Sequence, residues 1–179
     1  MDIPEFRYHP DPIRSGSIIK SDIECQCCGK RRGYIYTGPV YAEDDLGNAI
    51  CPWCIAVGKA YKKFNAEFVD TEAFPEGTPP ASIQKITQQT PGYSAWQSEA
   101  WPSCCGDATA FLRPTGIQEI RKECYEVEGH LMTYVVQELH ISGSAANRLV
   151  EALSKDGQPT LYLFQCLHCQ RYRFHIDGT

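Results

Sequence analysis

Four cysteines in the N-terminal third of the chain are spaced as two C-x-x-C pairs. Cys25 and Cys28 form the first pair, and Cys51 and Cys54 form the second. Two such pairs supply four thiolates, the number that a tetrahedral Zn²⁺ ion binds at a Zn–S distance of about 2.3 Å. A redox dithiol needs only one pair, usually in a βαβ setting. The pattern therefore predicts a structural zinc site, with Cys27 left over as a spare thiol.

The residues around these cysteines are expected to form the short elements that hold a zinc ion. Gly29 follows the first pair and can adopt the left-handed conformation that closes a tight turn. Residues 34–36 are predicted to be a strand, 37–39 a turn and 40–41 a return strand, which together make a hairpin. Pro52 suits the first turn of a helix. This layout is typical of a treble-clef or zinc-ribbon module.

A second, less complete cysteine group lies in the C-terminal half. The stretch 161–177 predicts two strands joined by a C-x-x-C turn that contains Cys166 and Cys169, a zinc-ribbon hairpin with half of its ligands. Cys105 is the expected third ligand, because it precedes a glycine as in the first pair, and because adjacent cysteines rarely point at one ion, which makes one of them the better ligand. The alternative is a set of buried, reduced cysteines. The fourth ligand is open among Cys104, Asp107, His168 and His175.

Composition and charge narrow the class of protein. The chain has 179 residues, enough for a hydrophobic core, and a formal net charge of −5. A negative balance argues against nucleic acid as the main partner, because phosphate binding needs a basic face. The N-terminus has no signal-peptide pattern, and no apolar run approaches the ~20 residues that span a bilayer. We therefore expect a cytoplasmic protein without membrane contact. Thiols stay reduced in the cytoplasm, so the cysteines are expected to bind metal rather than to form disulfides.

The chain divides by composition into four segments of an α+β protein. The fold class is α+β, with zinc-ribbon or treble-clef-like modules, short β-hairpins and several helices. Pro- and Gly-rich stretches mark the boundaries between the segments. They are an extended N-terminal arm at 1–20, an N-terminal zinc module at 21–70, a linker with a short helix at 71–92, and a helical C-terminal part at 93–179 closed by the second zinc-ribbon-like hairpin.

Three helices are predicted within the C-terminal part. Apolar side chains recur at helical spacing near 115–128 and near 130–141, and a further amphipathic run ends at Gly157. Cys124 falls on the apolar face of the first of these helices. It is interpreted as a small core residue rather than as a metal ligand.

Several motifs together resemble those of the CbrC family. They are "FRYHPDP", "SDIECQCCGKRRGYIYTGPVYAEDDL", "AICPWCIA", "TPGYSAWQ", "CCGD" and "YLFQCLHCQRYRFHID", and they cover essentially the whole chain. The resemblance implies a cytoplasmic bacterial protein with a role in tolerance of colicin E2, a DNA-cleaving toxin. Members often carry His-Cys-Gly-Asp where this chain has Cys104 to Asp107, and a further Cys where it has Thr109. The departure at Thr109 bears on the fourth ligand, whereas Cys104 keeps a metal-binding side chain.

The leading functional hypothesis is an immunity or tolerance protein that binds and neutralises a nuclease toxin. Nuclease active sites are basic, so an acidic protein is steered towards them and can block the substrate. Two acidic stretches are candidate surfaces, and tyrosines near the first could anchor an interface. The first stretch comprises Glu43, Asp44 and Asp45 with Tyr34, Tyr36 and Tyr41, and the second comprises Glu67, Asp70, Glu72 and Glu76.

Two other functional classes compete with this hypothesis. A nucleic-acid-binding zinc module would use "GKRRGYIY" and "QRYRFH", in which cations stand beside aromatic side chains, but each patch is small. An enzyme is disfavoured, because four-thiolate zinc is coordinatively closed and no triad order, Walker loop or H-E-x-x-H motif is present. The sequence thus predicts a non-enzymatic protein binder with structural Zn²⁺, with the nucleic-acid-binding module as the alternative.

Overall fold

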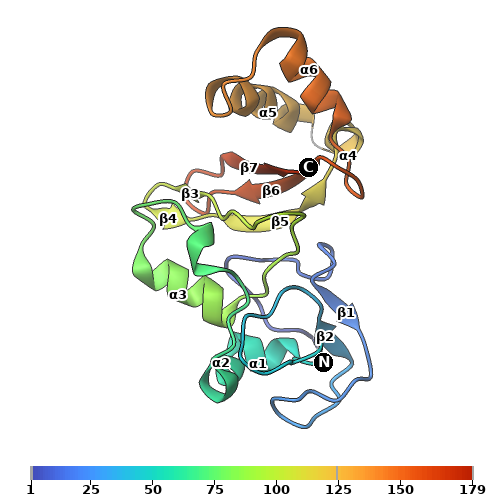
Figure 1. Cartoon of the computed structure of the whole chain (residues 1–179), viewed down its shortest axis with the longest axis vertical. Helices are drawn as coiled ribbons and strands as arrows, with labels where there is room; N and C mark the ends of the chain where they lie inside the picture. The colour runs from blue at the N-terminus through green and yellow to red at the C-terminus, as the bar shows by residue number, and fades with distance from the viewer. Residues whose placement is uncertain (1, 124, 179) are drawn as a thin grey trace.

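The computed structural model describes residues 2–123 and 125–178. These residues form an α+β fold with six α-helices and short antiparallel sheets, which confirms the predicted class (Figure 1). In chain order the elements are β1 (Ile18–Lys20), β2 (Tyr34–Tyr36), α1 (Pro52–Ala56), α2 (Lys59–Phe64), a 3₁₀ turn (Thr71–Ala73), α3 (Pro80–Gln89), β3 (Ser103–Cys104), β4 (Asp107–Ala108), β5 (Ala110–Thr115), α4 (Ile117–Glu123), α5 (Tyr125–Gln137), α6 (Gly143–Ala152), β6 (Thr160–Gln165) and β7 (Tyr172–Asp177).

A two-stranded sheet organises the N-terminal half. β2 pairs antiparallel with β1, so that Ile18 lies opposite Tyr36. The prediction of a return strand at 40–41 is wrong, because Tyr41 instead exchanges two backbone hydrogen bonds with Glu67, at 2.8 and 2.9 Å. Pro39 has no N–H to give to a ladder with β2. The strand partner therefore comes from the N-terminal segment.

The segment 2–20 is not the extended arm that was predicted, because it turns at 7–8 and again at 12–16 and buries Phe6, Tyr8 and His9 in the core. The backbone carbonyl of Tyr8 accepts a hydrogen bond of 2.8 Å from the N–H of Phe111 in β5. The His9 ring is completely buried, and its Nδ1–H donates to the carbonyl of Pro91 at 2.7 Å. Its Nε2 accepts from the Ser15 hydroxyl, also at 2.7 Å. Burial lowers the pKa of His9 to about 4, so the ring is neutral at pH 7.

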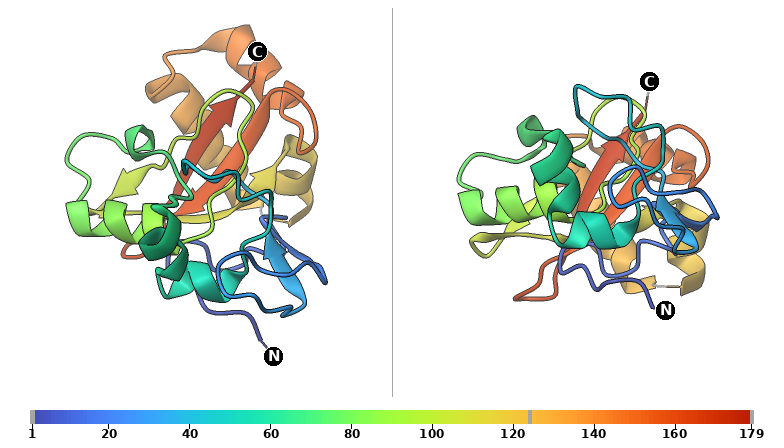
Figure 2. Two further views of the ribbon diagram at one scale, coloured as in Figure 1. Left: turned by 60° about the horizontal axis from the view of Figure 1, so that its bottom comes forward. Right: turned by 90° about the horizontal axis from the view of Figure 1, so that it is seen from below.

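A three-stranded antiparallel sheet, ordered β5-β6-β7, separates two apolar clusters in the C-terminal half. Alternate residues of β6 point to opposite faces, as a strand requires. Leu161 and Leu163 pack against α4, α5 and α6, whereas Tyr162 and Phe164 join an aromatic cluster with Trp101. The helices α5 and α6 cover one face of the sheet, and the N-terminal half lies on the other side (Figures 1 and 2).

The helices of the C-terminal part match the prediction in number and differ from it in their bounds. The described residues are helical over Ile117–Glu123 and Tyr125–Gln137, where helices were predicted at 115–128 and 130–141. Cys124, interpreted above as a core residue, lies outside the described residues. The last helix ends at Ala152 and not at Gly157, because Leu153 is extended. Within the described residues, no helix is long and apolar enough to cross a membrane.

Candidate metal centres

The two C-x-x-C pairs of the N-terminal half meet as one group of four sulfurs. The Sγ atoms of Cys25, Cys28, Cys51 and Cys54 all lie within 4.8 Å of one another. Cys25 Sγ is 4.0 Å from Cys54 Sγ, and Cys28 Sγ is 3.9 Å from Cys51 Sγ. Four thiolates around a tetrahedral zinc ion at about 2.3 Å have sulfurs about 3.8 Å apart. The spacing therefore fits Zn²⁺, and it is far from the ~2.05 Å of a disulfide.

Local backbone geometry explains how these four side chains converge. Gly29 has a φ of +66° and donates to the carbonyl of Cys25 at 2.7 Å, which closes the first cysteine turn as predicted. Pro52 occupies the first turn of α1, as expected, and Cys54 lies in the same helix. The N–H of Cys51 donates to the Cys25 sulfur at 3.2 Å. These hydrogen bonds place the two turns face to face.

Burial separates this first group from solvent. Cys25, Cys51 and Cys54 belong to the hydrophobic core of the N-terminal half together with Ile35 and Phe68. Hydrogen bonds with the Cys51 and Cys54 thiols lower the pKa of the Cys25 thiol, which favours its thiolate form. Four thiolates leave no open coordination position for a substrate, so an ion bound here has a structural role.

Cys27 stays outside the group, as the C-x-x-C spacing predicts. Its side chain is buried, and burial raises the pKa of its thiol.

Between the two cysteine turns, Arg32 stacks on the ring of Trp53 at 5.1 Å from the ring centroid. Arg32, one of the cations of the "GKRRGYIY" patch, is therefore engaged in a cation–π contact within the protein.

A second group of four sulfurs forms in the C-terminal half. The Sγ atoms of Cys104, Cys105, Cys166 and Cys169 lie within 4.8 Å of one another. Cys104 Sγ is 3.7 Å from both Cys105 Sγ and Cys169 Sγ. The group joins the β3–β4 turn to the turn between β6 and β7, more than 60 residues further along the chain, and its spacing also fits Zn²⁺.

Both adjacent cysteines contribute to this group, Cys105 as the favoured ligand and Cys104 as one of the four candidates for the fourth. Cys105 has a φ of +55° and Gly106 a φ of +74°, so the chain reverses within two left-handed residues. This reversal brings two consecutive sulfurs to the same side. The left-handed conformation is uncommon for a residue with a side chain, which is why the sequence pattern did not indicate it.

The other three candidates for the fourth ligand have different partners. His175 Nε2–H donates to the carbonyl of Ser98 at 3.1 Å. His168 Nε2–H donates to Asp107 Oδ2 at 3.3 Å. Neither histidine nor Asp107 joins the sulfur group within the described residues. The structure thus points to Cys104 as the fourth ligand.

Asp107 is instead the centre of a hydrogen-bond network beside the second group. It accepts hydrogen bonds from Tyr8 at 2.9 Å and from Ser82 at 2.7 Å, and forms an ion pair with Arg7 at 2.8 Å. Burial would raise the pKa of its carboxyl, but the hydrogen bonds from Ser82, Tyr8 and His168 outweigh burial and lower the pKa to about 2. The carboxylate therefore ties the second cysteine group to the N-terminal segment and α3.

The second group is the more exposed of the two. Cys105 and Cys169 are exposed, Cys104 is half-buried, and only Cys166 is buried. Burial would raise the pKa of the Cys166 thiol, but the N–H groups of Cys169 and His168 donate to its sulfur and the pKa is lowered to about 6. Arg173 donates to the Cys104 sulfur at 3.2 Å. A guanidinium at this distance compensates part of the negative charge of four thiolates.

The candidate partner-binding residues fall into two groups by exposure. Glu43, Asp44 and Asp45 are exposed and Tyr41 is 43% exposed. Tyr34 is half-buried, with its ring 6.5 Å from that of Trp53. Tyr36 is fully buried, so its prediction as an interface anchor is wrong. Its hydroxyl donates to the carbonyls of Pro39 and Phe68 and accepts from the N–H of Gly92, which makes it a core residue.

The fold and the sulfur groups together define an α+β protein with two four-cysteine sites that can hold zinc. The chain belongs to the uncharacterised protein family UPF0167, whose family model matches residues 3–178. The family description names no activity, so what the resemblance to the CbrC family implies about toxins stays an expectation. No solved structure matches the chain significantly.

Curated relatives match over almost the full length of both chains. UPF0167 protein Mb2317 of Mycobacterium bovis is 40% identical over 176 residues, which cover 98% of this chain and 93% of the relative. UPF0167 protein PA1536 of Pseudomonas aeruginosa is 40% identical over 179 residues, which cover 99% of this chain and 98% of the relative. The family match therefore spans residues 3–178, the range in which both cysteine groups of this chain lie.

Proposed function

We propose that this protein is a cytoplasmic immunity or tolerance protein that binds and neutralises a nuclease toxin, with two structural zinc ions holding its fold. The observation that carries the proposal is the position of the two acidic stretches. The backbone pairing of Tyr41 with Glu67 joins the first acidic stretch to the beginning of the second. Two stretches that are separate in the sequence therefore line adjoining grooves, which share Gly38 and Pro39.

This surface, called the acidic face below, consists of Glu43, Asp44, Asp45, Asp70, Glu72 and Glu99. It contains two grooves of about 540 and 580 Å³ that share Gly38 and Pro39 in their walls. Glu43, Asp44 and Asp45 line the first groove, and Tyr41, Asp70, Glu72 and Glu99 line the second. The sequence did not indicate Glu99, because only the fold brings its carboxylate to the backbone N–H of Asp70, at 3.0 Å.

The acidic face suits a basic protein surface such as a nuclease active site. Like charges gathered on one face attract an oppositely charged partner over a distance and speed its association. Burial raises the pKa of the Glu99 carboxyl to about 7, although the backbone N–H of Asp70 donates to this carboxylate and lowers the pKa. A lysine or arginine placed beside Glu99 would favour the ionised form. Binding should therefore strengthen as the pH rises through 7.

The proposed metal sites support a binding role rather than catalysis. In each group four sulfurs would complete the coordination of zinc, and zinc with four thiolates is poorly suited to activating water. The zinc ions would instead hold the turns that carry the loop 37–50 and the sheet behind it. We therefore include the absence of enzymatic activity in the proposal.

The test is binding to the DNase domain of a colicin E2-type toxin. We expect a 1:1 complex, protection of cells that express this protein, and an association rate that falls as salt rises, because the Debye length shrinks to ~8 Å at 0.15 M. The variant Glu43→Lys/Asp45→Lys should slow association roughly tenfold. Its matched control is Glu126→Lys/Glu138→Lys, an equal charge change on and just after α5, at the other end of the molecule (Figure 1).

The two outcomes of this test are distinct. Equal association rates for the two charge-reversed variants would contradict the use of the acidic face. If the DNase domain does not bind and duplex DNA does, with an affinity that falls steeply with salt, the alternative of a zinc-dependent nucleic-acid-binding module replaces the proposal. In that case the exposed cations near Tyr34 become the surface to mutate.

A further inference from the structure

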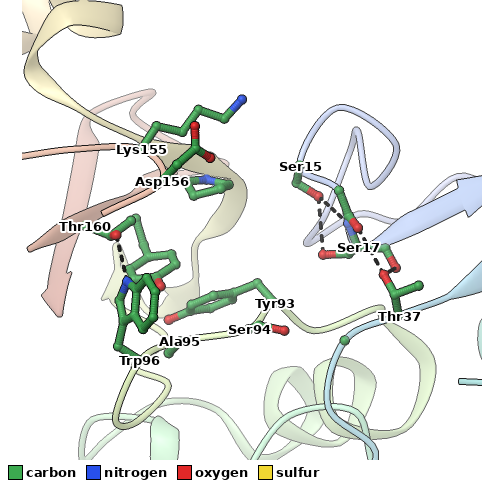
Figure 3. A pocket seen from close by; sticks show the side chains of 14 residues that line it. Ser15, Ser17, Thr37, Tyr93, Ser94, Ala95, Trp96, Lys155, Asp156 and Thr160 are labelled. Carbon is green, nitrogen blue, oxygen red and sulfur yellow. Dashed lines mark hydrogen bonds between the residues drawn. The ribbon is translucent and has the colours of Figure 1, made fainter. Parts of the chain in front are cut away.

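A pocket of about 450 Å³ lies between the N-terminal loops and the C-terminal sheet (Figure 3). None of the cysteines lines it, and neither do the side chains of the acidic face, although Thr37 and Gly38 border both the pocket and a groove of that face. Its volume lies in the range of small-molecule sites. The chemistry of its walls therefore indicates which class of ligand it would take.

One wall of the pocket is aromatic and rigidly held. Trp96, Tyr93 and Tyr162 line it, and the rings of Tyr93 and Tyr162 lie 4.8 Å apart. Trp96 is 51% exposed, yet its indole Nε1–H donates to Thr160 at 2.9 Å and its backbone N–H donates to Asp177 at 2.7 Å. An indole that is fixed in place and half-exposed is a pre-organised surface for stacking a flat ring.

The opposite wall carries hydroxyl groups from the N-terminal half, as Figure 3 shows for Ser15, Ser17 and Thr37. Two of these hydroxyls already donate within the protein. Ser15 donates to His9 Nε2, and Thr37 donates to the carbonyl of Gly16 at 3.1 Å. Their oxygens keep lone pairs, so this wall offers acceptors to a ligand with N–H or O–H groups.

Two charged side chains of opposite sign stand at the edge of the pocket. Lys155 and Asp156 follow α6, and both are exposed. Within the part of the chain that the structure describes, neither side chain forms an ion pair or a hydrogen bond. Lys155 offers a cation to an anionic group, and Asp156 offers two acceptor oxygens to hydroxyls.

We infer that this pocket binds a nucleoside 5′-monophosphate, with the base stacked on Trp96. This class of ligand combines the three features that the walls require: a flat ring with N–H donors, a pair of hydroxyls and an anionic group. The ribose hydroxyls would donate to Asp156 and the phosphate would lie near Lys155. A neutral sugar lacks the flat ring and the anion, and a free aromatic amino acid lacks the hydroxyl pair.

The test is titration of the full-length protein with adenosine 5′-monophosphate, followed by the NMR signals of the tryptophan indole N–H groups. The chain has three tryptophans, and Trp53→Phe and Trp96→Phe assign their signals. We expect the nucleotide to shift the Trp96 signal and to leave that of Trp53 unchanged. Trp96→Ala should weaken binding roughly tenfold, as loss of base stacking does elsewhere. Trp53→Phe is the matched control and should bind normally.

Related probes separate the contributions of the ring and the phosphate. Lys155→Ala should weaken binding of the monophosphate by roughly threefold and leave adenosine unaffected. Ribose 5-phosphate should bind much more weakly than the monophosphate. Equal binding of ribose 5-phosphate, unchanged binding by Trp96→Ala, or binding only of a single-stranded oligonucleotide would each overturn the inference. No toxin enters this measurement, so its result is independent of the proposed function.

Discussion

Asp107 and His168 bind each other: His168 Nε2 lies 3.3 Å from Asp107 Oδ2. Both side chains are polar neighbours of the second cysteine group, and both could have been metal ligands by position. Each belongs to a different turn of that group, so their contact joins the two turns a second time. Asp107 also receives hydrogen bonds from Tyr8 and Ser82, which extends the connection to the N-terminal segment and α3.

The first prediction follows from this contact. Asp107→Ala should lower the free energy of unfolding by about 3 kcal/mol, because it leaves buried hydroxyl donors and Arg7 without their acceptor. Chemical unfolding of the zinc-loaded protein measures the change. Asp156→Ala, which removes an exposed carboxylate, is the control and should change it by less than about 0.5 kcal/mol.

The same variant tests the ligand assignment. Asp107→Ala should retain the zinc content of the unmodified protein, because Asp107 lies outside the sulfur group. Loss of one zinc ion per chain from folded Asp107→Ala protein would show that Asp107 is a ligand.

The second prediction concerns the first cysteine group. Cys54→Ser should unfold the N-terminal half, because structural zinc sites supply roughly 10 kcal/mol of folding free energy in isolated fingers and Cys54 lies in that core. Circular dichroism and limited proteolysis would show the loss. The control is Cys27→Ala, which changes a buried cysteine of the Cys25–Cys28 turn that lies outside the sulfur group and should cost only about 1–2 kcal/mol. Metal loss from Cys27→Ala alone would contradict the assignment.

The third prediction compares the two groups. A chelator should remove zinc from the second group first, because Cys105 and Cys169 are exposed whereas Cys25, Cys51 and Cys54 are buried. Zinc release followed with a metallochromic dye should show two phases, and Cys169→Ser should abolish the fast one. A single phase, or a fast phase that persists in Cys169→Ser, would contradict the difference in exposure.

The sequence predicted the cysteines of the C-x-x-C turns better than it predicted which distant segments come together in the fold. The C-x-x-C spacing identified Cys25, Cys28, Cys51 and Cys54 because the spacing itself sets the local turn. The joint role of Cys104 and Cys105 depends on a positive φ at Cys105, which residue types alone do not reveal. The pairing of β1 with β2 and the approach of Glu99 to Asp70 are long-range contacts. Local patterns cannot predict them, because they arise when distant segments pack.

The fourth prediction concerns His9 and pH. The folded-state pKa of about 4 lies below the usual 6.5 of histidine. The unfolded chain therefore binds more protons than the folded chain between pH 4 and pH 6.5. The contribution of the neutral His9 ring to the free energy of unfolding is complete above pH 6.5 and is lost as the pH falls towards 4. The loss amounts to about 3 kcal/mol. His9→Gln should remove this part of the pH dependence.

The measurement for His9 is the free energy of unfolding at pH 7 and pH 5 for both proteins. Proton competition at the cysteines lowers zinc affinity in both, so the difference between the two pH dependences isolates His9. Parallel pH profiles for the unmodified protein and His9→Gln would contradict a neutral, buried His9.

The fifth prediction concerns metal content, and native mass spectrometry of the full-length protein tests most directly the claim that two four-cysteine zinc sites hold this fold. The protein should carry two zinc ions per chain, and Cys169→Ser should carry one, because the first group stays intact. The remaining ion should resist the chelator that empties the second group. An unmodified protein that carries one zinc ion or none after careful preparation, or two ions still bound to Cys169→Ser, would contradict the claim.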